Sequence, residues 1–72
     1  MSDSDAYDQG YRDGLYTGAN DARRGQSYNP QRSHFFKRSG AYQQAYLDGF
    51  LRGYAEGYQN YQRYFTNGHF HP

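Results

Sequence analysis

The sequence contains no cysteine, no tryptophan, no valine and no isoleucine. Without cysteine, disulfide bonds and thiolate metal sites are excluded. Without β-branched aliphatic residues, a β-sandwich or a barrel is disfavoured, because the strands of those folds draw on such residues. No run approaches the roughly 18 apolar residues of a membrane span, and no apolar stretch follows Met1. We therefore expect a cytoplasmic chain without a transmembrane segment.

Residues that carry out catalysis are also scarce. Glu56 is the only glutamate, and the sequence contains neither a Ser–His–Asp arrangement nor the spacing of a phosphate-binding loop. We expect a protein that is not an enzyme and that uses no cofactor. His69 and His71 form a His-x-His pair, but a metal site needs three or four converging ligands, so no metal site is predicted.

The 72 residues are rich in aromatic side chains, with ten tyrosines and five phenylalanines. Small residues recur at every fourth position in two blocks, and a bulky residue usually follows each of them directly. Residues four apart lie on one face of a helix. The pattern therefore predicts an all-α protein in which each of two helices carries a groove of small residues beside an aromatic ridge. The small residues are Ala6, Gly10, Gly14, Gly18 and Ala22, then Ala41, Ala45, Gly49, Gly53 and Gly57.

We predict a single small domain over 1–72, with a first helix over about 4–24, a connector over 25–39, a second helix over about 40–65 and a tail over 66–72. Arg23 and Arg24 precede Gly25, as the helix dipole and a glycine C-cap prefer. Asn29–Pro30 is typical of a cap and first turn, so the connector is compatible with a short helical turn over roughly 30–37.

Glycine inside a helix costs about 0.8–1 kcal/mol relative to alanine, so six interior glycines cost roughly 5 kcal/mol. We expect close approach of the two helices to offset this cost, with ridges packed into grooves at a steep crossing angle. The first block tapers from Tyr7 to Ala19 while the second has its deepest grooves last, which favours an antiparallel helical hairpin. The residues assigned to helix packing are Gly10, Gly14, Gly18, Gly49, Gly53, Gly57, Tyr7, Tyr11, Leu15 and Phe50.

One hairpin cannot bury fifteen aromatic rings, and tyrosine is enriched at protein interfaces. We expect the remaining aromatic side chains to bind a protein partner or further copies of the chain, the alternative being an ordinary solvated surface. The residues assigned to this contact are Tyr54, Tyr58, Tyr61, Tyr64, Phe65, Phe35 and Phe36.

The connector is basic, since no acidic residue lies between Asp21 and Asp48. Two interpretations stay open. In the first, the bases around Phe35 and Phe36 contact an anionic partner such as a phosphate, an acidic lipid, an acidic protein surface or nucleic acid. In the second, the phenylalanines plug the end of the hairpin among solvated charges. The net charge of +1 disfavours a dedicated nucleic-acid binder. The bases are Arg23, Arg24, Arg32, Lys37 and Arg38.

The segments GYRDGLYTG and DGFLRGYAEGY resemble the glycine-repeat adaptor proteins of eukaryotic cytosolic iron–sulfur assembly. They also resemble short bacterial proteins in which an Asp-x-Arg-x-Gly step, here residues 21–25, joins two Tyr/Gly blocks. The resemblance covers about 40 positions and implies a helical hairpin that binds partner proteins. In the adaptor family a C-terminal tryptophan recruits the client. This chain has no tryptophan and ends in HFHP, so the iron–sulfur role does not carry over.

Overall fold

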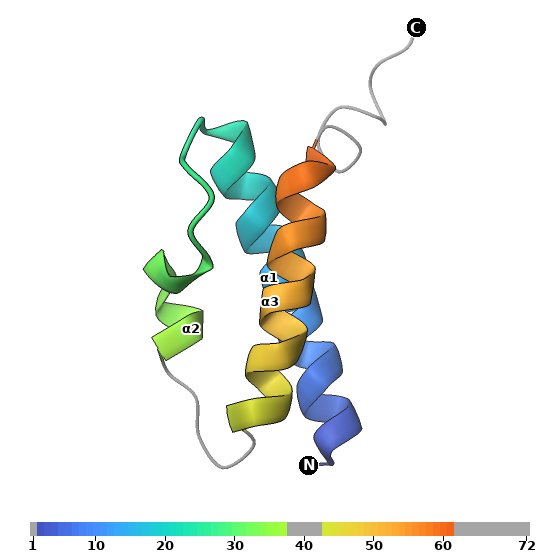
Figure 1. The fold of residues 1–72 in the computed structure, drawn as a ribbon. Coiled ribbons are helices and arrows are strands. Elements are labelled where there is room, and N and C mark those ends of the chain that lie inside the picture. Colours follow the sequence, from blue (N-terminus) through green and yellow to red (C-terminus); the bar gives the residue numbers. More distant parts are fainter. Residues whose placement is uncertain (1, 38–42, 62–72) are drawn as a thin grey trace, which may run out of the picture.

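A computed structural model describes residues 2–37 and 43–61, in which all regular secondary structure is helical. Helix α1 spans Asp3–Arg23, the 3₁₀ helix η1 spans Pro30–Arg32, α2 spans His34–Lys37 and α3 spans Gln43–Gln59. The all-α class and the close pairing of two long helices are confirmed, because α1 and α3 lie side by side (Figure 1). The short turn predicted near 30–37 is present as η1 and α2.

Local sequence signals set both ends of α1. The Ser2 hydroxyl accepts a hydrogen bond from the Asp5 N–H at 3.1 Å, which caps the first turn. At the other end Gly25 adopts a φ of 76°, a conformation that other residues rarely reach. Its N–H donates to the Ala22 carbonyl at 3.0 Å, and the Gln26 N–H donates to the Asp21 carbonyl. The predicted glycine C-cap is therefore confirmed, in the Schellman form.

The six helical glycines lie where α1 and α3 touch. A Cβ built on Gly10, Gly14 or Gly18 would collide with a backbone carbonyl oxygen of α3, and one built on Gly49, Gly53 or Gly57 would collide with a carbonyl oxygen of α1. The hydrogen that replaces Cβ therefore points at that oxygen, in the geometry of a Cα–H···O contact. Such contacts contribute about 0.5–1 kcal/mol each. Six of them return roughly 3–6 kcal/mol, which offsets the helix-propensity cost of the glycines.

The predicted antiparallel direction is wrong, because α1 and α3 run parallel (Figure 1). Gly10 lies against the Tyr46 carbonyl and Gly18 against the Tyr54 carbonyl, so contacts move toward the C-terminus on both helices together. In an antiparallel pair the order along α3 would reverse. The chain returns to the starting end by way of residues 24–37, which descend beside the helices (Figure 1).

The prediction failed because it placed the side-chain ridge of one helix in the groove of the other. In the structure the two grooves face each other and the backbones touch, so the taper of the side chains does not select the direction. The length of the connector indicates the relative direction of the two helices. Nineteen residues, 24–42, separate α1 from α3. Antiparallel neighbours are usually joined by about 2–8 residues, whereas nineteen residues reach well beyond the roughly 30 Å length of a 21-residue helix.

Candidate interaction site

The aromatic ridge of α3 forms the core of the chain. Phe50 and Tyr54 have no exposed surface. The connector covers them, with Phe35 centred 6.3 Å from Phe50 and Tyr28 packed edge-on at 5.1 Å from Tyr54. The assignment of Tyr54 to a partner contact is therefore wrong, because its side chain is enclosed by its own connector.

The Tyr54 hydroxyl fastens the connector to both long helices. It donates to Asp21 Oδ2 on α1 at 2.7 Å and accepts from the Asn29 N–H at 3.2 Å. Burial raises the pKa of the Tyr54 phenol above its ordinary value of 10.0; the Asn29 hydrogen bond opposes this change, and neighbouring Asp21 adds to it. Asp21 also accepts a hydrogen bond from Arg32 at 2.9 Å. A single carboxylate thus joins α1, α3 and η1.

The basic residues predicted to contact an anion divide into two groups. Arg32 is occupied, because it donates to Asp21 and to the carbonyl oxygen of Ser27 at 2.8 Å. Arg23 donates to Asn20 Oδ1 at 2.7 Å. Arg24 and Lys37 have exposed side chains. Arg38 lies outside the described residues. The four described bases lie at the end of α1, in η1 and at the end of α2, and Arg24 and Arg32 line one cleft.

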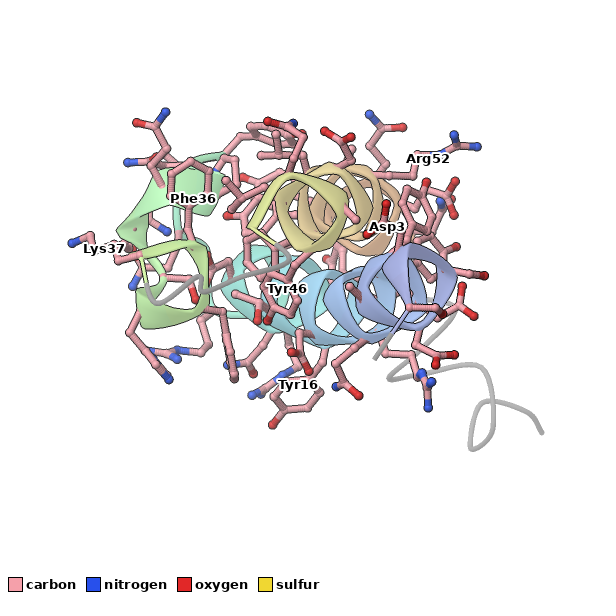
Figure 2. The ribbon with its side chains drawn as sticks, turned by 90° about the horizontal axis from the view of Figure 1, so that it is seen from below. Asp3, Tyr16, Phe36, Lys37, Tyr46 and Arg52 are labelled. Carbon is pink, nitrogen blue, oxygen red and sulfur yellow. The ribbon has the colours of Figure 1, made fainter. Side chains whose placement is uncertain are left out.

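A second set of polar contacts lies on the other side of the helix pair. The Tyr11 hydroxyl donates to Glu56 Oε1, and Arg52 Nε donates to Glu56 Oε2 at 2.7 Å. The Tyr11 hydrogen bond, with Arg52 second, lowers the pKa of Glu56 below its ordinary value of 4.5. The same Glu56 contact raises the pKa of Arg52. Figure 2 shows Arg52 on the side opposite Phe36 and Lys37 of the connector.

Among the described residues, Leu51 is the exposed large apolar side chain of α3, and Leu47 is half-buried. Leu47 and Leu51 lie one turn apart and opposite the glycine row. Leu51 is 40% exposed. Tyr58 is half-buried and contacts Tyr28, whose ring lies at 5.1 Å and which is itself 49% exposed. We call Tyr28, Leu47, Leu51 and Tyr58 the outer patch.

Sequence reasoning included only part of this surface. Tyr58 was assigned to a partner contact, and its hydroxyl is held by the Gln26 carbonyl at 2.6 Å. Phe35, Phe36 and Tyr61 are half-buried, while Tyr64 and Phe65 lie outside the described residues. Tyr28 is not among the predicted residues, although it lies directly before Asn29–Pro30, the predicted cap and first turn.

An open cleft of about 380 Å³ separates α1 from the connector. Its walls include Tyr16, Arg24 and His34, the last stacked on Phe35 at 4.4 Å. Tyr16 is 65% exposed and was not predicted as a site residue. This cleft combines aromatic surface with two guanidinium groups, those of Arg24 and of Arg32, the second of which is paired with Asp21.

Within residues 2–37 and 43–61, no group of three histidine or acidic side chains is placed to hold a metal ion. Nor is any helix in these ranges long and apolar enough to cross a membrane. His69 and His71 fall outside them. No known protein family, curated protein or solved structure matches the chain. The resemblance to glycine-repeat adaptors therefore stays a prediction.

Proposed function

We propose that this protein is a non-enzymatic interaction or assembly subunit, which docks through the outer patch onto a partner protein or onto copies of itself. The observation that carries the proposal is the exposure of Leu51 and Tyr28 although the chain already has a closed aromatic core. Neighbouring aromatic and aliphatic side chains on a rigid support are what protein interfaces bury at their centres.

The support is rigid for a physical reason. Glycine contacts lock α3 against α1, and Tyr54 locks the connector over α3. Tyr28 and Tyr58 are thus held in place before any partner arrives, which reduces the entropy lost on binding. The hydroxyl of Tyr58 is hydrogen-bonded within the chain, so its ring is available as an oriented apolar surface.

The test combines a solution mass measurement with a pull-down that uses the full chain. Leu51→Arg places a charge in the outer patch without touching the helix contact, and we expect it to abolish the assembly or the captured partner. Tyr16→Ser is the matched control, because Tyr16 is more exposed than Leu51 but lies outside the patch. If the Leu51 variant keeps the same mass and the same partner as the parent, the proposal is refuted.

Binding of an anionic surface or nucleic acid is the second candidate, favoured by the cleft where Arg24 lies beside Tyr16 and His34. Stacking on aromatic rings with nearby guanidinium groups is how single-stranded nucleic acid is held. Arg32 is already paired with Asp21, which weakens this candidate. Salt separates the two functions. Binding lost between low and moderate salt, and lost in Arg24→Ala, supports an anionic ligand. Salt-insensitive binding lost in Leu51→Arg supports the outer patch.

A further inference from the structure

One stripe of α1 forms a wall of the open cleft of about 380 Å³ between that helix and the connector. Its members Tyr16, Asn20 and Arg24 are spaced by four residues and therefore line up along one helix face, with Asp21 beside them. From Tyr16 to Arg24 the stripe extends about 12 Å along the helix axis. Pockets that enclose small ligands measure roughly 300–1,000 Å³, so the cleft has room for one small molecule and not for a folded partner.

The lower end of the cleft is aromatic. The connector descends from the C-terminal end of α1, so His34 lies toward the same end of the cleft as Tyr16 (Figure 1). The Tyr16 ring is 65% exposed and projects from α1 on the side away from α3 (Figure 2). His34 is also exposed, and Phe35, which packs on the core, supports one face of its imidazole ring at 4.4 Å. The two exposed rings favour a planar aromatic ligand, since every nucleobase has a π face that stacks on aromatic side chains.

The upper end of the cleft carries a positive charge. Arg24 is exposed, and its side chain has no hydrogen-bond or ion-pair partner among residues 2–37 and 43–61. Arg32 also lines the cleft, but Asp21 balances its charge. Two guanidinium groups against one carboxylate leave a formal charge of +1 in the lining when His34 is neutral. A guanidinium holds a phosphate through two parallel hydrogen bonds, so this end favours a single phosphate group.

Hydrogen-bonding groups lie between the two ends. Asp21 accepts from Tyr54 and from Arg32, and both hydrogen bonds end on Oδ2. Its Oδ1 atom accepts none from the described residues, so it can accept one from a sugar hydroxyl, as carboxylates do in dinucleotide-binding proteins. Asn20 accepts from Arg23 through Oδ1, which leaves its amide N–H groups as donors. The order along α1 is thus ring, acid and guanidinium, which is the order of base, ribose and phosphate in a nucleotide.

We propose that the cleft binds one nucleotide. Its base stacks against Tyr16 and His34. A ribose hydroxyl donates to Asp21 Oδ1, and the phosphate accepts from Arg24. The inference rests on the second candidate function given above, for which it names the ligand, and it does not involve the outer patch. The single charge of Arg24 provides for one phosphate, whereas a long strand requires a basic groove that follows its backbone. A free nucleotide and one nucleotide of a short single strand present the same chemistry to the cleft.

An NMR titration of the full chain with adenosine monophosphate tests the site. Adenosine lacks the phosphate and ribose phosphate lacks the base, so we expect each to bind about tenfold more weakly than adenosine monophosphate. Arg24→Ala should weaken the binding of adenosine monophosphate about tenfold and leave the binding of adenosine unchanged, whereas Tyr16→Ser should weaken both. Arg12→Ala is the matched control, because Arg12 is exposed on α1 one turn before Tyr16 but does not line the cleft. It should keep the parent affinity.

Three results would overturn the inference. Adenosine monophosphate does not saturate the protein at millimolar concentration; or adenosine binds as tightly as its monophosphate; or Arg24→Ala binds the monophosphate as tightly as Arg12→Ala does. Two further probes, a short single-stranded oligoadenylate and vesicles of phosphatidylserine, test the second candidate function separately. If either binds and is lost in Arg24→Ala while adenosine monophosphate does not bind, that function stands and the nucleotide inference is wrong. If none of the three binds, both are wrong.

The same probes identify the source of the nucleotide. Tighter binding of the oligoadenylate than of adenosine monophosphate assigns the ligand to a nucleic-acid strand, and the reverse ranking assigns it to a free nucleotide. Both rankings support the inferred chemistry of the cleft. Leu51→Arg, in the outer patch, should keep the parent affinity for adenosine monophosphate, so a failure of the outer patch leaves this test unaffected.

Discussion

Replacing Gly53 by alanine tests the helix contact most directly, because two physical effects predict opposite signs. Helix propensity alone predicts that Gly53→Ala stabilises the protein by about 0.8–1 kcal/mol. The structure predicts the reverse. The added Cβ would collide with the Tyr11 carbonyl oxygen and lie 2.9 Å from the Leu15 nitrogen. Both are backbone atoms of α1, so no side chain can rotate away and the helices must separate.

The size of the effect follows from the geometry. Overpacking a closed contact costs typically 1–3 kcal/mol, and separation also weakens the neighbouring Cα–H···O contacts at about 0.5–1 kcal/mol each. After the propensity gain is subtracted, we expect a net loss of about 1–2 kcal/mol. For a domain of this length that corresponds to a fall in melting temperature of roughly 4–16 °C.

Thermal unfolding followed by circular dichroism measures this change. Arg12→Ala is the control. Arg12 is exposed on α1, so its replacement by alanine adds no atom between the helices. Gly53→Leu extends the series and should splay or unfold the pair. If Gly53→Ala melts at or above the parent temperature, glycine is not required for the contact and the packing argument fails.

Three further predictions concern the core, the stability at acid pH and the direction of the two long helices. Tyr54→Phe removes the hydroxyl that binds a charged acid, so denaturant unfolding should show a loss of about 1.5–3 kcal/mol, and an unchanged midpoint would contradict the role of that hydroxyl. The pKa of Glu56 is lowered in the folded state, so the stability that Glu56 contributes is present above the ordinary pKa of 4.5 and is lost as pH falls through the folded pKa. Glu56→Gln should therefore flatten the acid side of the plot of stability against pH. An identical plot for the variant and the parent would count against this role of Glu56. Spin labels at residues 5 and 44 should lie close together in the parallel pair, and labels at residues 5 and 59 should be separated by about 22 Å along the helix axis, whereas the opposite ranking would restore the antiparallel hairpin.

The sequence by itself determined the elements and their contact surface. Because helical periodicity is a local property of the backbone, a spacing of four residues places each glycine row, the one with Gly10 and the one with Gly49, on one face of its helix. Gly25 and Asn29–Pro30 likewise marked their turns, since capping depends on neighbouring residues alone.

Tertiary structure alone decided the direction of the pair and the fate of each tyrosine. Tyr54 and Tyr7 both follow the same local pattern, a bulky residue directly after a small one, yet Tyr54 is enclosed and Tyr7 is 36% exposed. The difference arises because the described part of the connector, running back along a parallel pair, packs its aromatic rings on the side of α3 that contains Tyr54. Which side it covers depends on contacts between residues far apart in sequence, such as the bond of Tyr54 to Asp21, and helical periodicity carries no record of them.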